Sequence, residues 1–394
     1  MFLPASQSTL RSETLTLVAA LGRLGAAVDA VDVAALDRAG LCAVLARRHD
    51  AVYAVAGSQF RPGRGEEERE RAAVILDLTH GPLILRLGDP PFFPSYLAAL
   101  DRLRHRAVIS ARDIHFADFL DGAGIRPRGV AYAPGRYRED DHREVAAVDA
   151  PGRDIPFLFV ASLSDPEQAL APLRNILPQR VELALALSAA LAADSARPAR
   201  RVAEAVYAET DPDLVPWRGQ GRMMLEAACQ HVSARVRLDI IGRLWAHEGV
   251  IVTNEGRLPA ACRGPRRATL LPPMPPDGVA ALLRRSRLAI SVPPRWIIGA
   301  VSERVYGAMA AGVPVCERRG PGMDRHFEAG SHYLAYGPGL DGLEDAVIRA
   351  RADPASLAGM AAAARERVKG CFASLPNARM LFAPLMALPD MATP

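Results

Sequence analysis

Residues 302–320 read SERVYGAMAAGVPVCERRG, and their pattern decides the fold. Apolar residues recur at helical spacing up to Ala310, Gly312 follows as a stop, and VPVCE then forms a short apolar strand. Ser302 belongs to the residue types that cap helix starts, and glycine commonly ends helices in the left-handed conformation. Upstream, LAISVPP (288–294) indicates another strand. The segment therefore predicts a strand, a loop, a helix and a strand of a parallel α/β sheet.

The start of this helix is also a candidate ligand site. At the carboxyl end of a parallel strand, a helix N-terminus presents free N–H groups and about half a positive charge, which suits a diphosphate. Arg295 lies upstream and Arg304 lies in the first turn, and guanidinium groups bind phosphate oxygens in pairs. Glu303 can accept hydrogen bonds from sugar or ribose hydroxyls, and further arginines follow at Arg318, Arg319 and Arg325. The alternative is that the unit serves packing alone, as in any α/β protein.

Similar β-α alternation occurs on both sides of a charged segment at 135–154, which we interpret as a linker. Before it, residues 1–150 carry the strand patterns MFLPA, AAVDAVDV, DAVYAVAG, PLILRLGD and HRAVISARD. After it, 151–375 begins with IPFLFVASLS, continues as helix over 166–236, and returns to the strand patterns VRLDIIGR, GVIVTNEG, ATLLPP, LAISVPP, VPVCE and HYLAY. We predict two doubly wound, Rossmann-like domains facing a cleft, with a final helix in 376–394 that crosses back to the first domain.

Composition excludes several classes of protein. Half of the 394 residues are apolar, 23% are charged and the net charge is +4, which is typical of a globular α/β protein. Lys369 is the only lysine and lies outside any G-x-x-x-x-G-K-[ST] pattern, so a P-loop is excluded and a pyridoxal-phosphate enzyme is disfavoured. Basic residues are not interleaved with aromatics, so we expect no nucleic-acid partner.

The cellular compartment follows from weaker signals. Five cysteines are scattered without C-x-x-C spacing, which favours a reducing cytoplasm. The N-terminus lacks a signal-peptide pattern, and the apolar run LALALSAALAA is shorter than the roughly 20 residues that span a bilayer. We expect a cytoplasmic protein with no membrane span.

Two further motifs can each be interpreted either as a ligand site or as a structural element. GPGLDG at 337–342 matches G-x-G-x-x-G, but no strand follows to supply the ribose-binding acid, so we interpret it as a turn. Asp211 and Asp213 match the D-x-D pattern that chelates a metal with a nucleotide sugar. Because Asp and Pro also cap and start helices, and no histidines pair in a metal-binding motif, we expect no metal and no cofactor.

The residues quoted above resemble a family. SERVYGAMAAGVPV, then MDRHFEAGSHYLAY and ADPASLAGMAAAARERV, are similar to the C-terminal end of group 1 glycosyltransferases of the GT-B fold, in particular the bacterial spore-maturation-protein type. The resemblance implies that the C-terminal domain binds a nucleotide-sugar donor through Gly299, Ser302, Glu303 and Arg304. It departs from the family at Gly299 and Gly307, where retaining members carry a pair of glutamates.

The resemblance and its departure together predict the reaction. We expect metal-independent, inverting transfer to an acceptor glycan, protein or small molecule, with Asp89 or His115 as the base, and His80 as a competitor. Asp89 follows a strand pattern directly and adjoins aromatic residues suited to a sugar face. The alternatives are a sugar-nucleotide epimerase of the same architecture, a catalytically silent binding or scaffold protein, and an NAD enzyme that uses GPGLDG.

Overall fold

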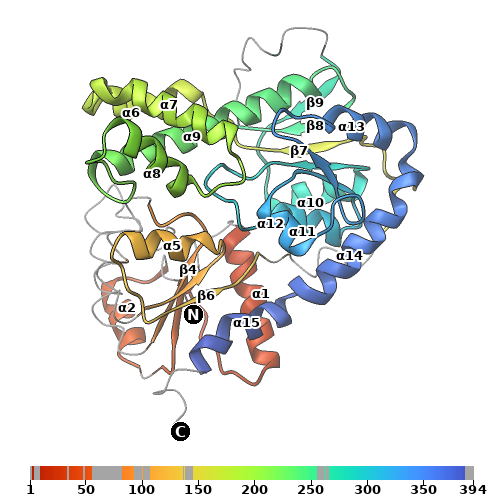
Figure 1. The fold of residues 1–394 in the computed structure, drawn as a ribbon. Coiled ribbons are helices and arrows are strands. Elements are labelled where there is room, and N and C mark those ends of the chain that lie inside the picture. Colours follow the sequence, from red (N-terminus) through yellow and green to blue (C-terminus); the bar gives the residue numbers. More distant parts are fainter. Residues whose placement is uncertain are drawn as a thin grey trace. The chain divides into compact units, whose positions relative to one another are not determined.

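The computed structural model describes residues 2–3, 9–32, 35–47, 49–55, 82–92, 100, 107–135, 137, 145–254, 262 and 266–386. The chain forms two compact units (Figure 1), Met1–Arg138 with Phe372–Pro394, and Glu139–Cys371. Both units are built on parallel strands and helices. This confirms the predicted α/β class.

The N-terminal unit contains a four-stranded parallel sheet in the order β3-β4-β5-β6 and a parallel pair β1-β2. Its strands are β1 (Phe2–Leu3), β2 (Val31–Asp32), β3 (Val52–Val55), β4 (Leu83–Leu87), β5 (Ala107–Ala111) and β6 (Gly129–Tyr132). Its helices are α1 (Thr9–Arg23), α2 (Arg38–Leu45), α5 (His115–Gly122) and α15 (Ser374–Met386).

Both faces of this sheet are buried. Leu83, Leu85 and Leu87 of β4 pack into one cluster that includes α2 and α5 residues, whereas Ile84 packs with residues of α1 and α15. Successive strand residues point to opposite faces, so a run of apolar residues suits a strand covered on both sides. α15 packs against α1 and β6, and the Asn377 side chain donates to Pro134 O at 3.0 Å.

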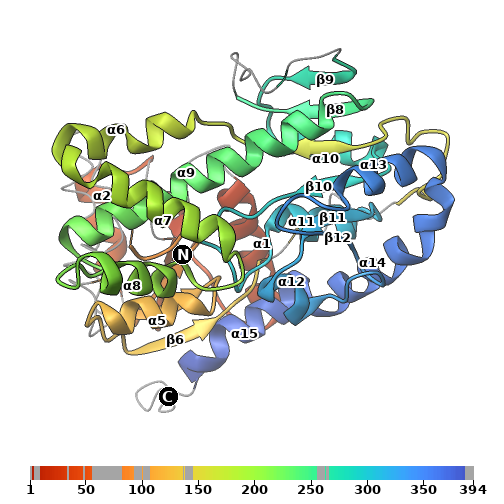
Figure 2. The same cartoon turned by 45° about the horizontal axis from the view of Figure 1, so that its top comes forward.

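The C-terminal unit contains a six-stranded parallel sheet in the order β12-β11-β10-β7-β8-β9 (Figure 2). Its strands are β7 (Leu158–Val160), β8 (Gly249–Val252), β9 (Ala268–Leu271), β10 (Ala289–Ser291), β11 (Val315–Arg318) and β12 (Leu334–Tyr336). Its helices include α10 (Pro276–Arg285), α11 (Glu303–Ala310), α12 (Pro321–His326), α13 (Leu343–Ala352) and α14 (Ala358–Phe372).

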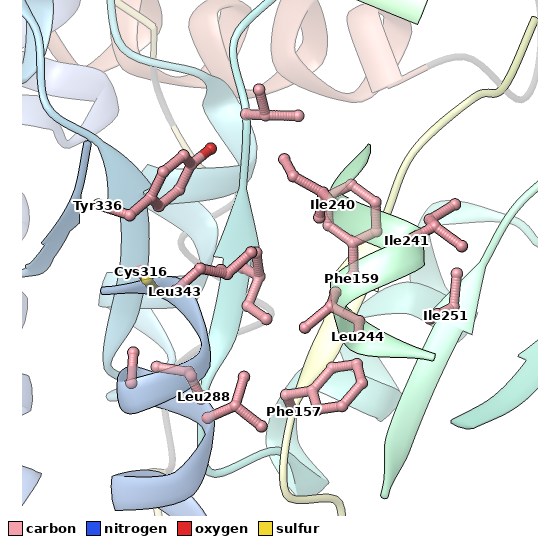
Figure 3. Packing of buried hydrophobic residues seen from close by; sticks show 14 of the residues in the cluster. Phe157, Phe159, Ile240, Ile241, Leu244, Ile251, Leu288, Cys316, Tyr336 and Leu343 are labelled. Atoms are coloured by element: carbon pink, nitrogen blue, oxygen red, sulfur yellow. The ribbon is translucent and has the colours of Figure 1, made fainter. Parts of the chain in front are cut away.

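Helices cover this sheet on both faces. On one face, Phe157, Phe159 and Ile251 pack with residues of α9 and α13, as Figure 3 shows for Ile240 and Leu343. On the other face, the strands lie against α10 and α11, and residues of both helices line an apolar cavity of about 90 Å³. The sequence pattern of the strands, apolar at nearly every position, reflects this double cover.

Four helices that pack on one another connect β7 to β8 along the chain: α6 (Pro166–Ile176), α7 (Val181–Ala193), α8 (Ala199–Thr210) and α9 (Gly219–Leu244). The expected strand VRLDIIGR at 236–243 is wrong, because these residues continue α9. Its apolar residues Ile240, Ile241 and Leu244 recur at a spacing that packs a helix on the sheet. None of the described helices combines the length and the hydropathy that crossing a bilayer requires.

The expected linker at 135–154 differs from a solvated connection in its last residues. Val148 and Arg153 are buried, and the Arg153 guanidinium lies among main-chain carbonyls of the C-terminal unit. The charged residues of this segment suggested solvent exposure. The burial of Arg153 could not be predicted, because the carbonyl groups that accept its hydrogen bonds are brought together only by the tertiary structure.

Candidate functional site

The strand order places a topological switch between β7 and β10. From β7 the chain proceeds to β8 and β9 on one side, and it then returns to β10, β11 and β12 on the other. Loops that leave two such neighbouring strands diverge, and ligands of open α/β sheets bind in the crevice at the carboxyl ends of these strands. The loops after β7 and β10 are therefore the place to look for a site.

Helix α11 begins at this edge, after the loop that follows β10. Ser302 caps it with extended backbone (φ −66°, ψ 141°), and its side chain accepts a hydrogen bond from Arg304 N at 3.4 Å. Gly312 has φ +63°, and the amide of Val313 donates to Ala308 O at 2.9 Å, which closes the helix as predicted. The helix thus directs the positive end of its dipole toward the carboxyl edge of the sheet.

Helix α12 contacts and supports the loop before α11. The amide of Gly322 donates to Ile298 O at 2.7 Å, and a Cβ at position 322 would lie 2.4 Å from Ala300 O. Gly299, one of the predicted site residues, is buried in this loop. The close approach explains why glycine stands at position 322.

Gly322→Ala is expected to shift residues 298–300, lower the free energy of unfolding by about 1–3 kcal/mol and weaken ligand binding at the start of α11. Urea denaturation and ligand titration measure the two effects. Gly320→Ala is the matched control, because a Cβ there meets no atom within 4 Å. Equal stability of the two variants would contradict the packing argument.

Two arginines from distant parts of the chain have charges that interact near the switch. Arg304 is exposed on the first turn of α11, and Arg237 projects from α9 with its Nη1 donating to Ser162 O, just after β7, at 2.9 Å. Burial lowers the pKa of the Arg237 guanidinium to about 10, and the nearby positive charge of Arg304 acts in the same direction. Like charges held together at a helix N-terminus favour an anionic ligand.

Arg237 was missed by the sequence reasoning, because it lies in the segment taken for a strand. Glu317 was also missed. It is 2% exposed at the end of β11, and burial raises the pKa of its carboxyl to about 7, opposed by the side chain of Ser291, the amide and charge of Arg318, and the charge of Arg304. A charged residue at the end of the otherwise apolar predicted strand VPVCE was the available signal.

The structure places Arg295 away from the start of α11. It is 1% exposed, and its side chain donates to the main-chain oxygens of Leu191, Asp194 and Arg197 at 2.7, 2.5 and 2.9 Å. These bonds tie the loop after β10 to the end of α7. We therefore assign Arg295 a structural role and leave it out of the proposed donor site, where Gly299, Ser302, Glu303 and Arg304 remain.

The candidate bases lie at the carboxyl edge of the N-terminal sheet. Asp89 follows β4 and is half-buried, and His115 begins α5 after β5, the neighbouring strand. The His115 amide donates to Asp113 Oδ1 at 2.9 Å, and its Nδ1 lies 3.7 Å from Asp118 Oδ2. The competitor His80 lies outside the described residues.

Phe92 does not provide the expected sugar-stacking face. It is 4% exposed, and its ring packs against Phe119 of α5 with the centroids 5.5 Å apart. Its contact instead links the loop after β4 to α5. Of the two aromatic residues that favoured Asp89, Phe92 is therefore a core residue, and Phe93 lies outside the described residues.

The two remaining motifs take structural roles. GPGLDG follows β12, the edge strand of the sheet, and forms a turn in which Gly337 N donates to Asp341 O at 2.9 Å. Asp211 ends α8 and pairs with Arg180 at 2.7 Å. Among the described residues, no three His, Cys, Asp or Glu side chains gather as a metal site would require.

Comparison with known proteins supports the fold and also points to the segment that contains α11. Residues 218–374 match a family model described as "Glycosyl transferase-like", a segment that includes α11 and the switch-point arginines. No curated protein sequence matches the chain significantly.

Solved structures are similar over nearly the whole chain. T4 phage BGT in complex with UDP-glucose has a TM-score of 0.56 at 11% identity, covering 99% of this chain and 97% of its own. HepE of Anabaena in complex with UDP and glucose has a TM-score of 0.52 at 15% identity, with 98% and 99% covered. A glycosyltransferase from Rickettsia africae ESF-5 has a TM-score of 0.51 at 11% identity, with 100% and 97% covered. The fold is that of GT-B glycosyltransferases.

Proposed function

We propose that this protein is a glycosyltransferase that moves a sugar from a nucleotide-sugar donor to an acceptor hydroxyl, without metal or cofactor and with inversion. The C-terminal unit binds the donor, and the N-terminal unit binds an acceptor that is a glycan, a protein or a small molecule. The spore-maturation-protein type remains part of this proposal. Five free cysteines support action in a reducing cytoplasm.

One observation carries the proposal: α11 begins at the topological switch of the C-terminal sheet, and the positive charges of Arg304 on this helix and Arg237 on α9 interact with each other. A diphosphate at this place would be attracted by the positive end of the helix dipole and would accept hydrogen bonds from both arginines. The likeness to proteins crystallised with UDP-glucose supports a uridine nucleotide sugar as the first donor to test.

The proposed reaction needs two contributions from the chain. A base, Asp89 or His115, takes the proton of the acceptor hydroxyl as its oxygen attacks the anomeric carbon. The bond from that carbon to the donor diphosphate breaks, and the electron pair leaves with the diphosphate. Arg304, Arg237 and the helix N-terminus stabilise the charge that develops there, which is the task a metal performs in other transferases.

The test is incubation with UDP-, GDP- and dTDP-sugars. Nucleotide release or sugar transfer supports the proposal, and interconversion of the sugar without transfer would identify an epimerase. Binding of a donor without any turnover would identify a catalytically silent binding protein. Absence of binding for every donor would refute a donor site at α11.

Arg304→Ala is expected to weaken donor binding about 10- to 100-fold, because charge-assisted hydrogen bonds contribute about 1.5–3 kcal/mol each. Arg304 is exposed, so the melting temperature should stay unchanged. Isothermal titration calorimetry measures the affinity. Arg284→Ala is the matched control, an exposed arginine in the last turn of α10 that precedes the amino end of β10. An Arg304→Ala affinity equal to that of the control would place the donor elsewhere.

A further inference from the structure

Glu317 is a buried carboxyl group at the carboxyl end of β11, beside the proposed donor site. It is 2% exposed, and its Oε1 accepts a hydrogen bond from Arg318 N at 2.9 Å. In the parallel register it stands opposite Ser291 of β10. Val315, two residues earlier, lines the cavity beneath α11, so Glu317 projects from the same face of the sheet, toward the helix that carries Arg304.

Charged and polar groups of the neighbouring elements act on this carboxyl. Arg304 of α11 and Arg318 of β11 act on it with positive charge, and the polar side chain of Ser291 acts from β10. The negative charge of Glu317 also raises the pKa values of its neighbours Cys316, Tyr333 and Tyr336. Because burial raises the pKa of the Glu317 carboxyl to about 7, this group changes its charge in the neutral range.

A diphosphate at the start of α11 would change this balance. The negative charge of Glu317 offsets part of the positive charge of the arginines when no ligand is bound. A ligand diphosphate brings further negative charge to the same arginines, and like charges nearby favour the protonated form of a carboxyl. Because linkage is reciprocal, a ligand whose binding favours protonation of Glu317 binds more strongly at lower pH.

We propose that Glu317 is a positioning residue of the donor site, which takes a proton from solvent when the donor diphosphate binds and thereby leaves the positive charge of Arg304 to the phosphates. The inference rests on the proposed function and adds to it a coupling between donor binding and a proton. No bond other than the O–H bond at the Glu317 carboxyl forms in this step.

The experiment follows the pH dependence of donor affinity by isothermal titration calorimetry, using whichever of UDP-glucose, GDP-mannose or dTDP-glucose binds. The diphosphate of each donor is esterified to the nucleoside at one end and to the sugar at the other. The ligand itself therefore does not titrate between about pH 6 and pH 8. For the wild type, we expect affinity to fall as the pH rises, by about tenfold for each unit by which donor binding raises the Glu317 pKa. Heats measured in buffers of different ionisation enthalpy should also reveal proton uptake on binding.

Glu317→Gln is expected to remove this dependence, because the amide is neutral and of the same shape. Its affinity should be constant across the range and equal to that of the wild type at low pH, and its proton uptake should vanish. Urea denaturation checks that the variant is folded. The raised pKa means that ionisation of Glu317 costs stability as the pH rises from the unfolded value toward 7, so the variant should be at least as stable as the wild type at pH 8. Glu366→Gln, an exposed change on α14, is the matched control.

The outcomes separate this inference from the proposed function. Donor binding with the same pH dependence in the wild type and Glu317→Gln would overturn the role of Glu317 and leave the donor site in place. Donor binding that is independent of pH in the wild type would do the same. If no donor binds at any pH, both the donor site and the coupling are wrong.

Discussion

Asp89→Asn is expected to lower kcat for sugar transfer by about 10²–10⁴-fold while donor affinity stays unchanged, because an amide cannot take the proton of an acceptor hydroxyl. The prediction rests on where the chain places this carboxylate. Asp89 follows β4 at the carboxyl edge of the N-terminal sheet, the edge at which α/β proteins hold reactive groups.

The surroundings of Asp89 fix the loop that carries it. Phe92 is packed against Phe119, and Arg86 on β4 donates to Ala133 O and, at 3.3 Å, to Pro134 O. A loop anchored on both sides of Asp89 can hold a base in one position, which general base catalysis requires.

Nucleotide release from the donor, measured with and without acceptor, gives kcat, and calorimetry gives donor affinity. Asp121→Asn is the matched control, the same chemical change at an exposed carboxylate of α5 that pairs with Arg126. A turnover of Asp89→Asn close to that of the control would exclude Asp89 as the base. A loss confined to His115→Gln would then assign the role to His115.

The sequence predicted the strand-loop-helix-strand unit around α11 because each boundary has a local cause. Ser302 caps the helix, Gly312 ends it with positive φ, and apolar residues on both sides of each strand identify a doubly covered sheet. The continuation of α9 through 236–243 was not predictable in this way, because a short run with Val236, Ile240 and Ile241 fits both periods. Packing on the sheet decides between them.

The candidate site was predictable only where it is local in sequence. Ser302, Glu303 and Arg304 lie together because they share one helical turn. Arg237 reaches the same edge from α9 through tertiary structure, and no spacing in the sequence relates it to Arg304. Arg295 shows the converse error. Its closeness in sequence to the start of α11 suggested that it binds phosphate, whereas its guanidinium donates to three main-chain carbonyl groups.

Arg153→Met is expected to lower the free energy of unfolding by about 3–5 kcal/mol. The substitution leaves several buried carbonyl groups without a donor, and each unsatisfied group costs about 1–3 kcal/mol. Water that reaches some of these carbonyls offsets part of the cost. The Arg153 side chain is 1% exposed and donates to five carbonyl oxygens, those of Ala146, Ala147, Ser286, Ala311 and Gly312. Two of these oxygens belong to the end of α11, where a positive charge also stabilises the helix dipole.

The measurement is urea denaturation, with Arg285→Met as the matched control. Arg285 pairs with Asp154, the neighbour of Arg153, but both side chains are more than half exposed (55% and 53%), so solvent screens the pair and its loss should change stability little. Because Arg153 joins residues 146–147 to the end of α11, its loss should also loosen the helix whose start is the proposed donor site. Donor affinity of the folded variant should therefore fall. A variant of Arg153 as stable as the Arg285 variant would show that these carbonyls find other donors, and that residues 145–154 act as the solvated linker that their charge suggested.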